Sequence, residues 1–368
     1  MTSPRIIADQ NMPLVEHYFG HLGEVKLMAG REINRQTIEG AEILLVRSVT
    51  VVNQGLLEGS SVRFVGSATA GTDHIDLDYL DNNGIQFAHS PGCNAEAVVQ
   101  YALSVFSRLK PQWQQSRVGI VGCGNVGGRL YQKLVKLGVE CCVYDPFLTA
   151  SKIPDLVEFN QLLSCDIISL HTPLTTDGQF PTHHMFNQQV LECLKPNSLL
   201  INAGRGAVID NLALINRLKQ SDGFQAALDV WESEPKINTD LLDLVSIATP
   251  HIAGYSTEGK IRGTSMLYDA LCQSYLDAES EQPVSVSLND KTASIETAGK
   301  ALNQLLLECY NIDEDDQRMR QALTQGDIGQ AFDQLRKNYP QRREYSHYRL
   351  DTDSAISHQL KILGFAGT

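Results

Sequence analysis

One stretch of the chain reads Arg117-Val118-Gly119-Ile120-Val121-Gly122-Cys123-Gly124-Asn125-Val126-Gly127-Gly128. Its apolar run, residues 118–121, is typical of a buried parallel strand. Gly122, Gly124 and Gly127 follow at G-x-G-x-x-G spacing, and apolar residues then recur at helical intervals. A second strand-like run ends at Asp145. This order of strand, glycine turn, helix, strand and acid predicts a βαβ unit that binds a dinucleotide.

Each glycine in this motif has its own physical role. Gly122 permits the tight turn, Gly124 lets the backbone approach a pyrophosphate, and Gly127 lets the helix pack closely on the strand. Asn125 and Val126 open the helix, whose unpaired N–H groups and positive dipole end favour phosphate. The alternative is that these glycines serve an ordinary turn, but the surrounding strands and helix favour the cofactor site.

The acid that ends the second strand indicates which dinucleotide binds. Asp145 can accept hydrogen bonds from both hydroxyls of the adenosine ribose. Its neighbours Pro146 and Phe147 offer no cation for a 2′-phosphate. The sequence therefore predicts NAD rather than NADP as the cofactor.

Length, composition and charge limit the possible functions. With 368 residues, of which 42% are hydrophobic, the chain is long enough for two or three domains with real cores. A net charge of −13 argues against a nucleic-acid or membrane-surface partner. We find no signal-peptide pattern, no apolar run long enough to span a membrane, and no C-x-x-C pair among the eight cysteines. These features predict a cytoplasmic protein.

The first 90 residues alternate between strand-like and helix-like segments, including a weak helix expected over residues 33–38. Such alternation predicts a small parallel sheet with helices on both faces. Ligands of these sheets bind beyond the carboxyl ends of the strands. The polar residues at those ends, Arg47, Ser48, Thr69 and Thr72, are candidates for substrate contact, although turn or cap chemistry would also account for each of them.

The same alternation continues after the dinucleotide motif. Four further strands are expected over residues 166–170, 198–201, 225–228 and 245–248. Polar residues follow each of these strands at its carboxyl end. This is the edge of the sheet at which the cofactor is expected to bind. The residues of interest there are Thr172, Arg205, Asp229, Glu234 and His251.

Three of these residues suit the oxidation of a secondary alcohol by NAD. His251 can take the hydroxyl proton near neutral pH. Arg205 can hold a carboxylate through two parallel hydrogen bonds. Glu234 can bind the other imidazole nitrogen, and Asp229 is expected to face the nicotinamide. Taken singly, each could be a surface, cap or turn residue, but together they predict an alcohol or hydroxy-acid dehydrogenase.

The blocks around these residues resemble the signature blocks of the D-isomer-specific 2-hydroxyacid dehydrogenases over about residues 5–280. In that family the residues matching Arg205, Glu234 and His251 are catalytic. The resemblance implies an α/β fold with two doubly wound parallel-sheet domains, one flavodoxin-like for substrate and one Rossmann for NAD. The extra C-terminal residues would form a small α+β domain.

The match narrows to a branch whose members oxidise a small phosphorylated hydroxy acid and form homodimers through a C-terminal domain. It rests on residues 46–50, 68–74, 90–95 and 332–339. This resemblance implies that the substrate contacts Ser48, Thr69 and Tyr255. It also implies that NAD contacts Asp145, Thr172, Asp229 and Gly254. The expected domains are residues 1–93 completed by 256–280, residues 94–255, and residues 281–368.

Several alternatives stay open. The nearest is another member of the family, such as an enzyme acting on 3-phosphoglycerate. A different class is a co-repressor-like module that binds NAD without turnover.

Two features of the C-terminal segment are also open. A substrate phosphate could rest on Ser48, Thr69 and Arg47, or also on Arg342 or Arg343, unless that basic run is a solvated face or forms dimer ion pairs. The apolar residues of the segment suggest either a dimer interface or its own core; they are Leu302, Leu305, Leu306 and Phe332.

Overall fold

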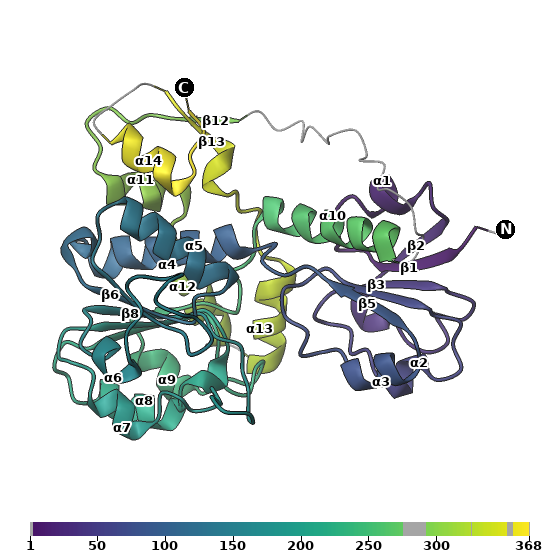
Figure 1. Ribbon diagram of the computed structural model, residues 1–368, viewed down its shortest axis with the longest axis horizontal. Coiled ribbons are helices and arrows are strands. Elements are labelled where there is room, and N and C mark those ends of the chain that lie inside the picture. The colour runs from purple at the N-terminus through teal and green to yellow at the C-terminus, as the bar shows by residue number, and fades with distance from the viewer. Residues whose placement is uncertain (1–2, 275–291, 325, 352–355, 368) are drawn as a thin grey trace. The chain divides into compact units, whose positions relative to one another are not determined.

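The computed structural model describes residues 3–274, 292–324, 326–351 and 356–367. The chain forms two compact units, one of Met1–Asn94 with Ser256–Lys291 and one of Ala95–Tyr255 with Thr292–Thr368 (Figure 1). The expected boundary at residue 281 lies outside the described residues. The division into three domains therefore stays a prediction.

The first unit is built on a five-stranded parallel sheet with strand order β2-β1-β3-β4-β5. This order is the flavodoxin-like one that the sequence predicts. Its elements are β1 Arg5–Asp9, α1 Val15–Phe19, β2 Glu24–Met28, η1 Gly30–Glu32, β3 Ile43–Val46, α2 Gln54–Leu57, β4 Phe64–Ser67, α3 Leu77–Asn82, β5 Gln86–His89 and α10 Thr257–Ser274.

Alternate side chains of these strands fill two cores, one on each face of the sheet. On one face Ile6 and Phe64 pack against Leu267 of α10, so the late helix α10 completes this unit. On the other face Leu44 packs with Leu80 of α3. Helices therefore cover both faces, as the doubly wound prediction requires.

The prediction of a helix over residues 33–38 is wrong. The Asn34 side-chain oxygen accepts the N–H groups of Gln36 and Thr37 at 3.0 and 3.2 Å, and the Thr37 hydroxyl donates back to the Asn34 carbonyl at 2.9 Å. These local bonds hold a turn and compete with helical pairing. The segment is therefore a loop that leads into β3.

The second unit contains a six-stranded parallel sheet with strand order β11-β10-β9-β8-β6-β7. An isolated parallel bridge joins Val143 of β7 to Leu156, in the place of a third outer strand. With that bridge the order becomes that of the Rossmann fold. The elements are α4 Ala95–Leu109, η2 Trp113–Gln115, β6 Val118–Val121, α5 Asn125–Lys136, β7 Cys141–Tyr144, α6 Phe159–Leu162, β8 Ile167–Leu170, α7 Gln188–Glu192, β9 Leu199–Asn202, η3 Gly206–Val208, α8 Asn211–Leu218, β10 Gln225–Leu228, α9 Thr239–Leu244 and β11 Ile247–Ala248.

The C-terminal segment packs on this sheet as part of the same unit (Figure 1). Leu302, Leu305 and Leu306 are at most 5% exposed and join the core that also holds Trp113. Phe332 joins the core on the opposite face. The elements are β12 Ala293–Ile295, α11 Leu302–Cys309, α12 Ile312–Leu323, α13 Ile328–Lys337, η4 Tyr345–His347, β13 Tyr348–Leu350 and α14 Ser357–Leu363, with β12 and β13 paired in parallel.

Helix α12 covers the edge of the large sheet. Asp316 accepts the backbone N–H of Ala248 in β11 at 2.7 Å. Arg320 donates to the carbonyls of Leu242 and Val245 at 2.7 and 2.9 Å. Asp316 thereby satisfies a backbone N–H of the edge strand, and Arg320 ties α12 to the carboxyl end of α9.

No helix in the described part of the chain combines the length and apolarity needed to cross a bilayer.

Candidate active site

The glycine turn after β6 has the geometry that its sequence predicts. Gly122 has φ +82°, a value that disfavours any side chain. A Cβ on Gly127 would lie 2.0 Å from the Gly122 carbonyl oxygen, so helix α5 packs directly on the turn. A Cβ on Gly124 would meet nothing within 4 Å. The turn is therefore crowded by protein atoms at Gly122 and Gly127. At Gly124, the glycine expected to face a pyrophosphate, there is open space.

Asp145 is fixed at the end of β7 beside this turn. One carboxylate oxygen accepts the N–H of Cys123 at 2.9 Å and the other accepts the N–H of Phe147 at 3.0 Å. Each oxygen keeps a further lone pair for a ligand hydroxyl.

A cavity of about 410 Å³ begins at Asp145. Phe147 and Phe180 stand edge to face in its wall, with ring centroids 5.7 Å apart. Its lining also includes Gly122 and the segment that follows Thr172. Such a site suits the adenosine end of a dinucleotide, since it combines apolar walls with the carboxylates of Asp145 and Asp177.

Thr172, which lines the same cavity, follows β8 together with His171. The Thr172 hydroxyl oxygen is buried and has no hydrogen-bond partner in the described part of the chain. Burial lowers the pKa of His171 to about 4, so its ring is neutral at physiological pH. An unpaired buried hydroxyl lining the cavity fits a bound polar ligand, and the residues present therefore fit NAD.

His251 and Glu234 form a pair, as the sequence predicts. The His251 Nδ1–H donates to Glu234 Oε2 at 2.7 Å, which leaves Nε2 as the nitrogen able to take a proton. The other Glu234 oxygen accepts the N–H of Trp231 at 2.8 Å. Burial alone raises the pKa of Glu234, but the His251 charge and these hydrogen bonds lower it overall. Glu234 is therefore a carboxylate at neutral pH.

Asp229 holds the turn that presents His251. Its two oxygens accept from the Thr249 hydroxyl at 2.7 Å and from the N–H groups of Ile252 and Ala253 at 2.8 and 2.9 Å. Burial is the main cause that raises the pKa of Asp229. His251 itself has φ +57°, so the turn is held in a conformation that non-glycine residues rarely adopt. A contact of Asp229 with the nicotinamide stays a prediction.

The sheet brings Arg205 to the edge from which this pair comes. Asn202 at the end of β9 lies in register with Leu228 of β10, which in turn lies in register with Ala248 of β11. The segments carrying Arg205 and His251 therefore leave the sheet at the same edge. Arg205 Nη1 donates to the Gly204 carbonyl at 2.9 Å.

Arg336, in helix α13, is a site residue that the sequence analysis missed. Its guanidinium hydrogen-bonds the Tyr255 side chain, and its Nε is buried without a partner in the described residues. Burial by itself lowers the pKa of Arg336, but Tyr255, Glu234 and Asp229 raise it overall. The C-terminal segment thus places a cation beside the Glu234–His251 pair. No sequence spacing reveals it, because about a hundred residues separate Arg336 from Glu234.

Arg342 was considered either as a phosphate contact or as part of a solvated basic face, but the structure buries it within the chain. It is buried, donates to the carbonyls of Ala97 and Ala253, and lies 4.3 Å from the ring centroid of Tyr310. It therefore does not belong to a solvated basic face. It fastens the C-terminal segment to helix α4 and to the His251 turn.

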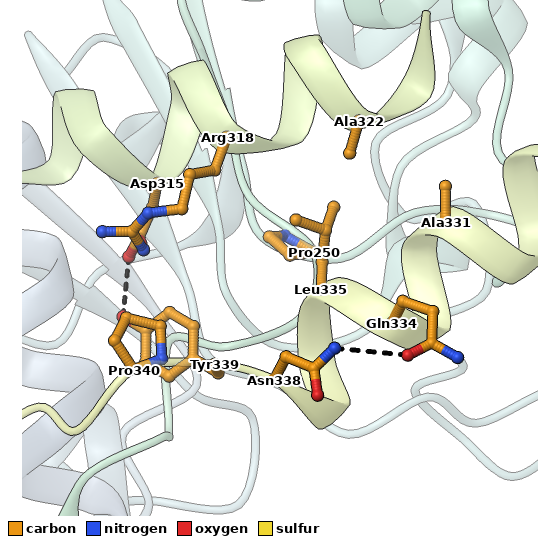
Figure 2. Close-up of a pocket in the computed structure, with 10 residues that line it drawn as sticks. All are labelled: Pro250, Asp315, Arg318, Ala322, Ala331, Gln334, Leu335, Asn338, Tyr339 and Pro340. Atoms are coloured by element: carbon orange, nitrogen blue, oxygen red, sulfur yellow. Dashed lines mark hydrogen bonds and ion pairs between the residues drawn. The ribbon is translucent and has the colours of Figure 1, made fainter. Parts of the chain in front are cut away.

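A second cavity, of about 320 Å³, lies behind the His251 turn (Figure 2). Pro250, which precedes His251, forms part of its wall together with α12 and α13. Asp315 in that wall accepts from the hydroxyls of Tyr310 and Tyr339 at 2.8 and 2.7 Å. These bonds stabilise the packing of α12 and α13 behind the His251 turn.

The remaining predicted substrate residues belong to the first unit. Ser48 follows β3 and is exposed, whereas Thr69 follows the neighbouring strand β4. The Thr69 hydroxyl bonds Ser67 Oγ at 2.7 Å and donates to the Gly71 carbonyl at 2.9 Å. Their contacts with substrate stay a prediction.

Comparison with known families agrees with this geometry. Residues 101–253 match the family described as D-isomer specific 2-hydroxyacid dehydrogenase, NAD binding domain. Residues 284–364 match a family described as a domain of unknown function.

Two relatives are similar along almost the whole chain. The erythronate-4-phosphate dehydrogenase of Cellvibrio japonicus is 44% identical over 98% of this chain and 99% of its own. That of Teredinibacter turnerae is 46% identical over 98% of both chains.

Solved structures share the fold. The NAD⁺-bound 3-phosphoglycerate dehydrogenase of Entamoeba histolytica has a TM-score of 0.65 at 23% identity, covering 77% of this chain and 99% of that one. The D-lactate dehydrogenase of Aquifex aeolicus, with NAD and lactic acid, has a TM-score of 0.62 at 23% identity, covering 74% and 95%. At 23% identity, these two structures show that the fold is shared.

Proposed function

The chain belongs to the erythronate-4-phosphate dehydrogenases, within the D-isomer-specific 2-hydroxyacid dehydrogenase family, and we propose that it oxidises 4-phospho-D-erythronate with NAD. The product is (R)-3-hydroxy-2-oxo-4-phosphobutanoate, an intermediate of pyridoxal 5′-phosphate biosynthesis. The observation that carries the proposal is the 2.7 Å bond between His251 and Glu234 in a chain so similar to these relatives.

The reaction removes two hydrogens from the C2 alcohol of the substrate. When bound, NAD accepts the hydride from C2. The Nε2 of His251 takes the hydroxyl proton, and the ring becomes a cation. Glu234 stabilises that cation through the Nδ1–H bond and keeps the ring in the tautomer that leaves Nε2 free. After the reaction His251 returns the proton to solvent.

The substrate carries a carboxylate and a phosphate, so it needs two cationic sites in a chain of net charge −13. We assign the carboxylate to Arg205, which can bind it with two parallel hydrogen bonds. Arg336 supplies a second cation beside Tyr255. Ser48, Thr69 and Tyr255 complete the proposed contacts.

The cofactor contacts follow from the site geometry. The N-terminal end of α5, with Gly122, Gly124 and Gly127, receives the pyrophosphate. Asp145 receives the adenosine ribose. Further proposed contacts come from Asn125, Val126, Thr172, Asp229 and Gly254.

We propose a homodimer formed through the C-terminal segment and a location in the cytoplasm. The apolar residues that suggested an interface are buried within the chain itself, so they do not support a dimer. The family resemblance supports it instead. Light scattering on the full chain gives the mass directly, and a mass of one chain at micromolar concentration would contradict the dimer.

The substrate is tested by following NADH formation. Purified protein is given 4-phospho-D-erythronate or 3-phospho-D-glycerate at equal concentration, with a 2-oxoacid present to reoxidise bound NADH. We expect a clear preference for the four-carbon acid. A preference for 3-phosphoglycerate would leave the catalytic pair standing and refute the substrate assignment.

The same assay separates an enzyme from a module that only binds NAD. The change His251→Asn removes the proton acceptor and should lower turnover by about 10²–10⁴-fold. NAD affinity, measured by calorimetry, should stay unchanged. Equal turnover in both proteins would exclude His251 as the base.

A further inference from the structure

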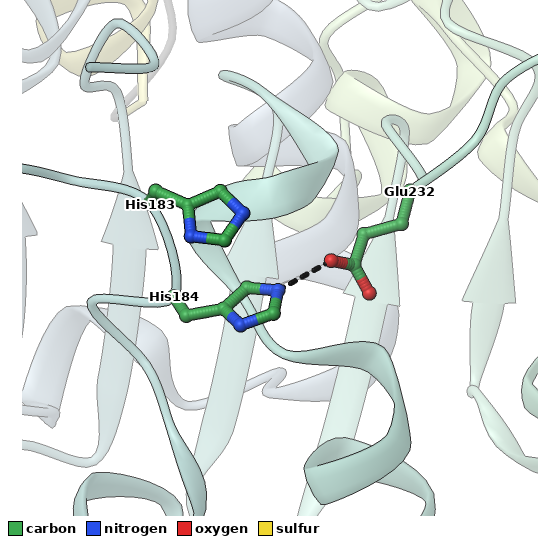
Figure 3. Close-up of side chains that lie close together, drawn as sticks. All are labelled: His183, His184 and Glu232. Atoms are coloured by element: carbon green, nitrogen blue, oxygen red, sulfur yellow. Dashed lines mark hydrogen bonds and ion pairs between the residues drawn. The ribbon is translucent and has the colours of Figure 1, made fainter. Parts of the chain in front are cut away.

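Three side chains of types that can bind a metal ion lie close together, outside the Glu234–His251 pair. His183 and His184 stack with ring centroids 4.0 Å apart and planes 22° apart. His184 Nε2 lies 2.5 Å from Glu232 Oε1. One donor atom from each residue falls within a group whose members are all within 4.8 Å of one another. In Figure 3 a nitrogen of each ring lies on the side that faces the Glu232 carboxylate.

The backbone fixes the histidines before any ligand binds. The His183 N–H donates to the Thr175 carbonyl at 3.0 Å, and the His184 N–H donates to the Ala207 carbonyl at 2.8 Å. His184 has φ +49°, which is uncommon for a residue with a side chain. Such outliers persist where the surroundings impose them, and they concentrate at functional sites.

The carboxylate is oriented as well. Glu232 Oε2 accepts the N–H of Asn211, at the start of α8, at 3.0 Å. The other oxygen is thereby directed towards His184. No hydrogen bond of the His183 ring is found within the described residues, so its nitrogens remain available.

An outer carboxylate completes the arrangement. Asp210 Oδ2 lies 4.0 Å from His184 Nδ1, while its Oδ1 accepts the N–H groups of Leu212 and Ala213 and caps α8. Histidines that bind metal commonly direct their second nitrogen at such a carboxylate, which fixes the tautomer and raises ligand basicity. Two carboxylates beside two imidazoles also favour a divalent cation.

We propose that His183, His184 and Glu232 bind one divalent transition-metal ion of the Zn²⁺ class, with water at the remaining position. Imidazole and carboxylate are ligands that Zn²⁺ accepts at about 2.0–2.2 Å. The three donor atoms already lie within 4.8 Å of one another, and in the proposed site they converge on the ion. The ion replaces the direct His184–Glu232 bond.

The position of the site gives the ion a structural role. Thr175, Thr182 and Met185 line the cofactor cavity, so the two histidines end one wall of that cavity. Glu232 lies two residues before Glu234. A bound ion ties the cavity wall to the loop that carries the catalytic carboxylate.

The test measures metal binding without turnover. Full-length protein, free of affinity tags, is treated with a chelator, dialysed, and titrated with Zn²⁺ by calorimetry and with Co²⁺ by absorption. The variants are His183→Gln, Glu232→Gln and Asp210→Asn. His358→Gln, on the exposed face of α14, and Cys193→Ser, the one exposed cysteine, are the matched controls.

We expect one ion per chain in the wild type and in both controls. Loss of the outer carboxylate in Asp210→Asn should weaken binding by about 10–100-fold. His183→Gln and Glu232→Gln should weaken it further, while circular dichroism and NAD affinity of the metal-free proteins stay unchanged. Co²⁺ should quench the fluorescence of Trp231, which adjoins Glu232.

Three results would overturn the proposal. One is equal affinity in wild type and His183→Gln. Another is binding lost in Cys193→Ser, which would place the ion on the thiol. The last is no stoichiometric binding by the wild type, which would leave His184 and Glu232 as a hydrogen-bonded pair only.

Discussion

Replacement of Glu234 by Gln tests whether the carboxylate stabilises the His251 cation that forms during turnover. The change keeps the size of the side chain and one hydrogen bond to Nδ1–H but removes the negative charge. Two unit charges about 4 Å apart interact by about 4 kcal/mol at an effective dielectric constant of about 20.

The net effect should be smaller than this Coulomb energy. The side chains of His251 and Glu234 are 35% and 20% exposed, so solvent screens the pair. Hydrogen bonds to charged groups contribute about 1.5–3 kcal/mol. Since about 1.4 kcal/mol corresponds to a factor of ten in rate, we expect Glu234→Gln to lower the rate of hydride transfer by roughly 10–100-fold.

The assay is single-turnover NADH formation in a stopped-flow instrument, because product release can limit steady-state turnover. The matched control is Asp243→Asn, an exposed carboxylate of α9 in the same unit. A rate within threefold of wild type in Glu234→Gln would refute the reasoning, and so would a loss confined to KM.

Other predictions follow from the same geometry. Arg336→Met should lower kcat/KM for the phosphorylated acid by about 10–100-fold, as for a charged hydrogen bond, and leave NAD affinity unchanged; an unchanged kcat/KM would remove Arg336 from the site. Gly127→Ala forces a Cβ to 2.0 Å from the Gly122 oxygen and should cost at least about 1–3 kcal/mol of stability. Gly124→Ala should instead keep the melting temperature of the wild type and lose NAD affinity. Equal melting temperatures of the two variants would contradict this reasoning. The pKa of His171 falls from about 6.5 unfolded to about 4 folded, so stability is full above pH 6.5 and declines by about 1–3 kcal/mol as pH drops to 4. Urea unfolding of His171→Asn against pH should show a smaller decline.

The parts of the fold that depend on local sequence could be predicted. The dinucleotide motif combines strand, glycine turn and helix within about 30 residues, so spacing alone indicates it. Positive φ at Gly122 and the crowding at Gly127 confirm the physical reasons given for those glycines. The weak helix over residues 33–38 failed because Asn34 and Thr37 satisfy the backbone locally.

The pairing of Glu234 with His251 could be predicted for a different reason. Polar residues at the carboxyl ends of neighbouring parallel strands meet at one edge of the sheet. The order of strands along the chain is therefore enough to predict that Glu234 and His251 lie close together. The place of Arg336 beside Glu234 could not be predicted, because it depends on tertiary packing between distant segments. The same holds for the His183–Glu232 cluster, whose members lie in separate loops.

The cover that α12 places over β11 has a consequence for protein synthesis. The ribosome delivers the large sheet long before Asp316 emerges, so the nascent chain holds an edge strand without its α12 contact and an incomplete active site. A chain terminated before α13 also lacks Arg336. Truncated products are therefore expected to be inactive and prone to aggregate, and chaperones have a defined substrate in the interval before the last helices arrive.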